Sequence, residues 1–328
     1  MDDCLLHVEN LSTSFHTSDG LVPAVAGVSF DVMRGETVAI VGESGSGKTV
    51  TALSIIKLID MPPGEIYADS IVFDGKDLLE MGEEDMRMVR GDAISMIFQE
   101  PMTSLNPVLT VGLQVAEALE THRGMGRTEA LEETVKLFRL VGIPLPERRI
   151  NEYPHQLSGG MRQRVMIAMA LACGPGLLIA DEPTTALDVT IQAQILDLLK
   201  SLKNKLNMAV ILITHDFGVV AEMADRVLVM YASQIVEEAP VVPLFRHPRH
   251  PYTRGLMLSI PSVTEKKPAL HVIPGVVPSP MFFPKGCRFG PRCDRATEKC
   301  RAQAPEMVEM GNGRAVRCWY PLYEGELE

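Results

Sequence analysis

The eight residues from Gly42 to Thr49 constrain the fold more than any other part of the sequence. They read Gly-Glu-Ser-Gly-Ser-Gly-Lys-Thr and follow the apolar run Thr37–Val41, which predicts a buried strand. A helix is predicted directly after them, over residues 50–59. A strand, a glycine-rich turn and a helix in this order predict an α/β fold whose turn, a P-loop, binds phosphate.

Each residue type in this turn has a physical reason to be there. Glycines let successive backbone N–H groups point inward around a phosphate, and the start of the helix adds a partial positive charge. Lys48 is expected to reach the β- and γ-phosphates, and the Thr49 hydroxyl to ligate Mg²⁺. An ordinary Gly/Ser turn is the alternative, but it requires neither the lysine nor the threonine. The predicted nucleotide-binding residues are Gly42, Glu43, Ser44, Gly45, Ser46, Gly47, Lys48, Thr49 and Val50.

The rest of the chain divides by pattern and composition. Residues 4–30 alternate short apolar segments with polar turns, as an antiparallel sheet does, and residues 128–141 have helical spacing between a cap at Thr128 and a stop at Gly142. Two further buried strands, Leu177–Ala180 and Ala209–Thr214, favour parallel strands in the core. From Pro240 to Pro284 there are ten prolines, too many for regular structure, so we place a boundary between domains 1–239 and 240–328.

Two carboxylates end the predicted strand Leu177–Ala180. Asp181 is placed to coordinate Mg²⁺ and Glu182 to polarise a water molecule. Strands often end at acidic residues, so this pair has meaning chiefly because a P-loop precedes it in the chain.

A second glycine-containing helix start lies at Leu157-Ser158-Gly159-Gly160, or LSGG. Because LSGG precedes the strand that ends at Asp181-Glu182-Pro183, and Thr-Thr-Ala-Leu-Asp follows at 184–188, the sequence resembles the ABC ATPase family. In that family this element binds the γ-phosphate of ATP held by the opposite subunit. Met161 stands where the family usually has glutamine, but the phosphate-facing groups, Ser158 and the backbone of Gly159 and Gly160, are present.

The resemblance implies roles for four further residues. Gln99 corresponds to the glutamine that contacts Mg²⁺ and faces the transmembrane partner, and Asp188 to the loop that communicates between paired cassettes. His215 corresponds to the histidine that contacts the γ-phosphate, although a lone histidine after a strand is more often structural. Phe15 lies near the position of the aromatic that stacks on adenine; a core phenylalanine in an edge strand is the alternative.

A subfamily can also be recognised. The segments His250–Thr253, Pro274–Pro278 and Phe98–Pro107, with Glu100 where aspartate is more usual, are similar to oligopeptide and dipeptide importer ATPases, the D-type ATPase of dipeptide importers above all. The resemblance implies a RecA-like core with an antiparallel β subdomain, a helical subdomain over about 100–165 and a small cysteine-bearing C-terminal appendage.

It further implies ATP and Mg²⁺ as cofactors and a peripheral place on the cytoplasmic face of the inner membrane. The implied partners are a homologous second ATPase, two permease subunits and an extracytoplasmic solute-binding protein. Nickel, glutathione and cationic peptides use similar ATPases, so the cargo stays open.

Four cysteines crowd the end of the chain: Cys287, Cys293, Cys300 and Cys318. Their gaps of five, six and seventeen residues leave zinc, disulfides and free thiols open. Resemblance to the dipeptide importer ATPases implies that they ligate a [4Fe–4S] cluster. Residues 281–318 carry a net charge of +4, from eight basic and four acidic side chains, which we expect to lower the thiol pKa values.

Composition excludes several other functions. The net charge of −11 does not favour nucleic-acid binding, and no apolar run approaches the roughly 20 residues that span a bilayer. No basic, secretory N-terminal segment is expected. Two rival functions remain: a soluble ABC protein of DNA repair or translation, and a nucleotide-binding regulator without hydrolysis. The single cassette without sustained heptads argues against the first, and the presence of Glu182 and His215 against the second.

Overall fold

A computed structural model describes residues 3–99, 104–185, 187–260 and 272–323. The chain forms two compact units, and each is described by itself. The helical unit comprises Met1–Leu6, Val32–Glu36 and Phe73–Ile213; the P-loop unit comprises His7–Asp31, Thr37–Val72 and Thr214–Glu328. The predicted boundary between residues 239 and 240 therefore stays a prediction about domains, since the compact units divide the chain at other points.

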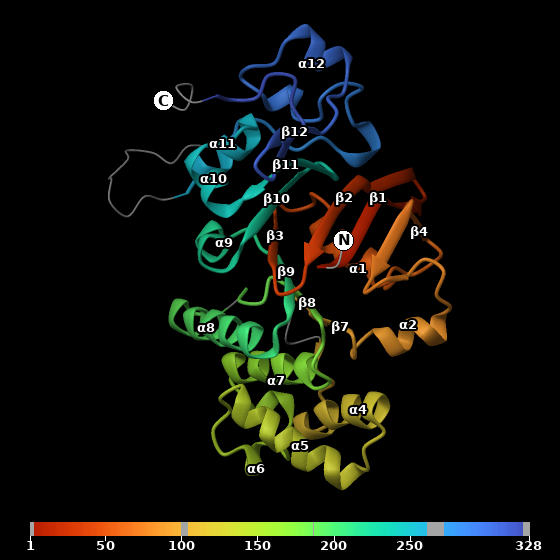
Figure 1. The fold of residues 1–328 in the computed structure, drawn as a ribbon, viewed down its shortest axis with the longest axis vertical. Coiled ribbons are helices and arrows are strands. Elements are labelled where there is room, and N and C mark those ends of the chain that lie inside the picture. Colours follow the sequence, from red (N-terminus) through yellow and green to blue (C-terminus); the bar gives the residue numbers. More distant parts are fainter. Residues whose placement is uncertain (1–2, 100–103, 186, 261–271, 324–328) are drawn as a thin grey trace. The chain divides into compact units, whose positions relative to one another are not determined.

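The P-loop unit contains five strands of a mixed sheet, in the order β12-β13-β11-β10-β3. Figure 1 labels β12, β11, β10 and β3. β3 (Thr37–Val41) is buried throughout and pairs in parallel with β10 (Arg226–Tyr231), which confirms the predicted strand. The remaining pairs are antiparallel and involve β11 (Gln234–Pro240), β12 (Val308–Gly311) and β13 (Arg314–Val316). The last two strands of the chain thus extend the sheet that carries the P-loop.

A second, five-stranded sheet includes β1 (Cys4–Thr17), β2 (Gly20–Met33), β4 (Gly64–Tyr67) and β5 (Ser70–Phe73). The antiparallel arrangement predicted for residues 4–30 is confirmed, but as two 14-residue strands instead of short segments. Polar residues do not end these strands, because side-chain hydroxyls accept backbone hydrogen bonds: Asn10 N–H donates to Ser29 Oγ and Gly27 N–H to Ser12 Oγ.

Short helices complete the P-loop unit. They are α1 (Lys48–Ile55), α9 (Phe217–Met223), α10 (Val241–Arg246), α11 (Pro251–Leu258) and α12 (Glu298–Ala302), with 3₁₀ turns η2 (Pro280–Phe282) and η3 (Gly290–Arg292). The helix predicted over 50–59 is shorter and begins earlier, because Gly47 caps it and Lys57 has a left-handed φ of 51°.

The expectation that the proline-rich segment lacks regular structure is wrong, since it contains α10 and α11. Proline fits the first turn of a helix, where no N–H partner is needed, and Pro251 is the first residue of α11.

One apolar core contains residues of β3 and of the C-terminal region, which comprises residues 240–260 and 272–323 of the P-loop unit. Val41 of β3 belongs to the same buried cluster as Tyr231 of β10, Tyr252 of α11 and Phe289. The Tyr231 ring centroid lies 4.6 Å from that of Tyr252 and 5.2 Å from that of Phe289. The C-terminal region is therefore built into the core behind the P-loop and is no separate tail.

The helical unit contains three parallel strands in the order β9-β8-β7: β9 (Ala209–Ile213), β8 (Leu177–Asp181) and β7 (Ile94–Ile97). The two strands predicted here are confirmed to within one residue. Its other elements are β6 (Lys76–Asp77), α2 (Glu83–Val89), α4 (Val111–Arg123), α5 (Arg127–Leu140), α6 (Pro146–Arg149), η1 (Pro154–Gln156), α7 (Gly159–Leu171) and α8 (Val189–Leu206).

Helices α4, α5 and α7 pack against one another (Figure 1). The predicted helix 128–141 is α5, which ends before Gly142 as expected; Gly142 has a φ of 74°. Thr128 is not its cap. Gly126 occupies that position, so Thr128 lies inside the first turn. Within the described ranges, no helix is long and apolar enough to cross a membrane.

Candidate functional site

The P-loop backbone is shaped by close approaches that only glycine permits. A Cβ on Gly42 would lie 2.2 Å from Met230 O, and one on Gly47 would lie 2.4 Å from Ala24 O. Gly45 and Gly47 have φ values of 76° and 101°, which side chains disfavour. The turn from β3 into α1 therefore requires the glycines that the sequence supplies.

Polar groups in this turn fit a phosphate. Lys48 is 7% exposed, and its Nζ donates to the carbonyl oxygens of Gly42 at 2.9 Å and Glu43 at 3.1 Å. Ser46 Oγ is buried and has no hydrogen-bond partner among the described residues. The first turn of α1 carries no acidic residue and its cap, Gly47, no side chain, so its N–H groups are available to an anion. Thr49 and Val50 follow as half-buried residues, and Ser44 is exposed.

Glu43 makes contacts that the sequence did not predict. Its backbone N–H donates to the Tyr252 hydroxyl at 2.9 Å, and its carboxylate forms a two-point ion pair with Arg292. Because Glu43 and Arg292 are 249 residues apart, no local pattern indicates this pair.

Two other predicted residues lie in the P-loop unit. Thr214 N–H donates to Ile40 O at 3.3 Å, near the end of β3 that leads into the P-loop. His215 is the next residue in the chain and is exposed. Phe15 is half-buried in β1 opposite Gly64 of β4. Its stacking on adenine stays a prediction.

The helical unit holds the predicted carboxylates. Asp181 ends β8 and is 2% exposed, and Glu182 follows with a left-handed φ of 45°. Glu182 Oε2 accepts hydrogen bonds from Gln99 Nε2 at 3.1 Å and from Thr185 Oγ1 at 2.8 Å. The structure therefore brings Gln99 and Glu182 together and adds Thr185, which the sequence analysis missed. A hydroxyl three residues after the carboxylate, within a tight turn, is the signal that could have found it.

The LSGG element forms the start of α7 in the same unit. Ser158 caps the helix through its Oγ, which accepts from Met161 N–H at 3.3 Å. A Cβ on Gly160 would meet Ile191 of α8 at 2.8 Å, so glycine lets the two helix starts approach. Asp188 caps α8, because its Oδ1 accepts a hydrogen bond from Ile191 N–H at 2.9 Å. Ser158 and Gly159 are exposed, so this helix start is accessible to an anion from outside the chain.

The four C-terminal cysteines line one small cavity of about 20 Å³. Cys287 N–H donates to Cys300 O at 2.7 Å, which ties two of the cysteine segments together. None of the four forms a disulfide. In the part of the chain that is described, however, no group of three or more His, Cys, Asp or Glu side chains is arranged to hold a metal ion.

The expected lowering of the thiol pKa values is wrong for three of these cysteines. Burial raises the pKa of the Cys287 and Cys293 thiols, and raises that of Cys318 to about 12, with nearby cysteines adding to the effect. The basic residues counted in the sequence do not offset this loss of solvation.

Comparisons with known proteins agree with these features. Residues 25–185 match the family described as ABC transporter, and residues 236–300 match the oligopeptide/dipeptide transporter C-terminal region. The oligopeptide transport ATP-binding protein AppD of Bacillus subtilis is 54% identical over 98% of both chains. The dipeptide transport ATP-binding protein DppD of Escherichia coli is 50% identical over 97% of both chains. The dimeric structure of MJ0796, a bacterial ABC transporter cassette, is similar with a TM-score of 0.63 and 30% identity, over 72% of this chain and 98% of that one.

Proposed function

This chain belongs to the ABC transporter family, in the branch with the oligopeptide/dipeptide transporter C-terminal region, and we propose that it is the ATP-hydrolysing subunit of a peptide importer. The observation that carries the proposal is the end-to-end match to ATP-binding subunits of oligopeptide and dipeptide transport. ATP-dependent uptake of a radiolabelled dipeptide by the assembled transporter tests it, because neither a soluble ABC protein nor a silent regulator drives uptake.

In the proposed reaction, water attacks the γ-phosphorus of ATP in line with the bond to the β–γ bridging oxygen. The bond from the water oxygen to phosphorus forms, the bond to the bridging oxygen breaks, and ADP and phosphate leave. Glu182 orients the water and accepts its proton, and Gln99 and Thr185 hold the carboxylate in place. Lys48 and His215 stabilise the negative charge on the γ-phosphate.

Mg²⁺ would be held by Thr49, Asp181 and Gln99, whose oxygens are the donors it prefers. When bound, it neutralises charge on the β- and γ-phosphates. Asp181 suits this role because it is a buried carboxylate at the end of a strand and is adjacent to Glu182.

We further propose that Ser158, Gly159 and Gly160 act on ATP held by a second, homologous ATPase, and that Asp188 takes part in communication between the two cassettes. The exposure of Ser158 at the start of α7 supports action outside the chain. Two permease subunits and an extracytoplasmic solute-binding protein complete the proposed importer, at the cytoplasmic face of the inner membrane. Similar importers of nickel, glutathione or cationic peptides are the alternatives for its cargo.

A mixed complex tests the action of Ser158 across the interface. Ser158→Ala in this chain alone is expected to reduce hydrolysis chiefly at the partner's P-loop, because the serine completes the opposite site. Photolabelling by azido-ATP after turnover distinguishes the two sites. Loss confined to this chain's own site would contradict the arrangement.

We also propose a [4Fe–4S] cluster on Cys287, Cys293, Cys300 and Cys318. It is supported by four free thiols that line one cavity. In the described part of the chain, however, the observed arrangement does not itself form a ligand set for a metal ion. Binding would require these side chains to rearrange, and the thiols, whose pKa burial raises at Cys287, Cys293 and Cys318, to lose their protons.

Anaerobic purification tests the cluster. We expect a brown protein with broad absorption near roughly 400 nm and about four irons per chain, as for thiolate-bound iron clusters. Cys318→Ser should remove most of the colour, whereas Cys173→Ser, on a cysteine outside this cavity, should keep it. A colourless anaerobic protein with stoichiometric zinc would refute the cluster.

A further inference from the structure

A two-point ion pair joins the P-loop to the C-terminal region. Arg292 Nη1 lies 2.7 Å from Glu43 Oε2, and Nη2 lies 3.1 Å from Oε1. The Arg292 side chain is 4% exposed and that of Glu43 31%. Because a nearly buried guanidinium is poorly solvated, its pairing matters more than that of a surface pair. The same contact raises the pKa of Arg292, which therefore stays charged.

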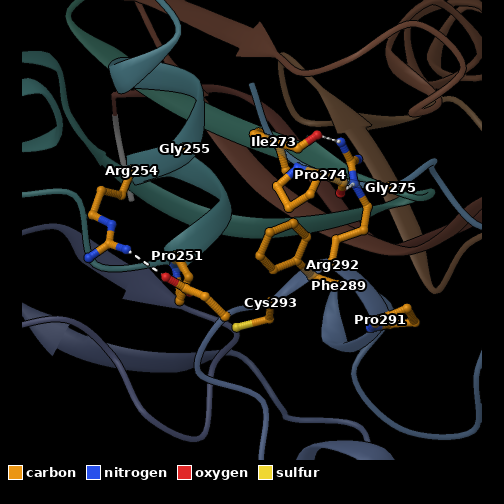
Figure 2. A pocket seen from close by; sticks show the side chains of 11 residues that line it. Pro251, Arg254, Gly255, Ile273, Pro274, Gly275, Phe289, Pro291, Arg292 and Cys293 are labelled. Atoms are coloured by element: carbon orange, nitrogen blue, oxygen red, sulfur yellow. Dashed lines mark hydrogen bonds and ion pairs between the residues drawn. The ribbon is translucent and has the colours of Figure 1, made fainter. Parts of the chain in front are cut away.

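Arg292 is held in place by contacts that do not involve Glu43. Its Nε donates to Pro274 O at 3.0 Å and its Nη2 to Ile273 O at 3.3 Å, as Figure 2 shows. Gly275, with a φ of 79°, lets the backbone approach, since a Cβ there would lie 3.3 Å from Arg292 Cγ. Arg292 also ends η3, a turn that begins directly after Phe289, and Phe289 lines the cysteine cavity. Contacts within the C-terminal region therefore fix the orientation of the Arg292 guanidinium.

Glu43 is held at its backbone as well. Its N–H donates to the Tyr252 hydroxyl at 2.9 Å, and its carbonyl oxygen accepts from Lys48 Nζ at 3.1 Å and from Ser46 N–H at 3.2 Å. Arg292 and Tyr252 therefore fix the second residue of the P-loop from outside it. Lys48, the residue proposed to bind the phosphates, contacts the carbonyl oxygen of the same residue.

The charge of Glu43 gives this contact a consequence for ATP. A carboxylate within the phosphate-binding loop has the same sign as the triphosphate and would repel it if it were not neutralised. We propose that Arg292 is a positioning residue of the nucleotide site: it neutralises Glu43 and holds the start of the P-loop in the shape that binds ATP. This inference rests on the proposed function and adds a role of the C-terminal region in nucleotide affinity.

Replacing Arg292 by methionine, a side chain of similar length without charge, tests the role. In the assembled complex, Arg292→Met is expected to raise the Kd for a fluorescent ATP analogue, and the KM for ATP, about tenfold, with kcat changed less than about twofold. The matched control is Arg254→Met. Arg254 and Arg292 line one cavity of about 390 Å³ (Figure 2). Arg254 pairs there with Asp294 at 3.0 Å.

A double variant separates charge neutralisation from general loss of packing. Glu43→Gln/Arg292→Met removes the same contacts to Pro274 and Ile273 as the single variant, yet leaves no unpaired carboxylate. The Kd of the double variant is expected to lie within about threefold of the wild-type value. Its melting temperature is expected to stay below that of the wild type, because the contacts to Pro274 and Ile273 are still lost. An unchanged Kd in Arg292→Met would overturn the inference. So would a rise in the Kd of the double variant, or of Arg254→Met, that equals the rise in Arg292→Met. Wild-type protein that neither binds nor hydrolyses ATP would instead overturn the proposed function.

Discussion

Replacing Glu182 by glutamine is expected to leave ATP binding intact and to reduce hydrolysis by at least about 100-fold, the usual range for loss of a general base. The amide keeps the size of the side chain and can still contact Gln99 and Thr185, but it cannot accept a proton from water. Steady-state phosphate release by the assembled complex, beside the Kd for ATP, measures both parts of the prediction.

The neighbouring threonine supplies a graded control for this variant. Thr185 Oγ1 donates to Glu182 Oε2 at 2.8 Å but does not take the proton. Thr185→Val should therefore lower kcat by only about tenfold, the effect of one hydrogen bond to a charged group. Wild-type turnover in Glu182→Gln would show that another residue is the base.

Replacing Lys48 by alanine is expected to weaken ATP binding about 100-fold, because the buried cation that we propose to bind the phosphates is lost. The Lys48 amine also bonds to the carbonyl oxygens of Gly42 and Glu43, so its removal leaves two loop acceptors without this donor. Equilibrium binding of a fluorescent ATP analogue measures the change.

Lys76→Ala is the matched control for charge, since Lys76 is an exposed lysine on the short strand β6. It should leave the Kd unchanged. If Lys48→Ala bound ATP as tightly as this control, the proposal that Lys48 contacts the phosphates would be contradicted.

Local patterns predicted the elements that carry the candidate site. The apolar run Thr37–Val41 with its glycine turn became β3 and the P-loop, and the predicted strands Leu177–Ala180 and Ala209–Thr214 became β8 and β9 to within one residue. These predictions succeed because a buried strand and a glycine turn are specified by neighbouring residues. The predicted cap of α5 was wrong because Gly126, two residues before Thr128, also suits a helix start and occupies that position.

Contacts over long distances in the chain could not be predicted. The pairing of Glu43 with Arg292 depends on the fold of some 250 intervening residues, and neither residue has a local partner that signals it. The cysteine pKa values failed for a related reason: the sequence shows the basic residues near Cys318 but not the burial that outweighs them. The prediction that the proline-rich segment lacks regular structure was wrong, because the position of a proline, and not the number of prolines, decides whether a helix such as α11 forms.

The central claim is that ATP hydrolysis by this chain drives peptide import. Its direct test is uptake of a radiolabelled dipeptide into proteoliposomes that contain the assembled transporter with its solute-binding protein. With the wild-type chain, uptake should require ATP and Mg²⁺ and exceed the ATP-free background at least about tenfold; with Glu182→Gln it should fall to that background while ATP still binds. Uptake that is the same with and without ATP, or that persists in Glu182→Gln, would contradict the account.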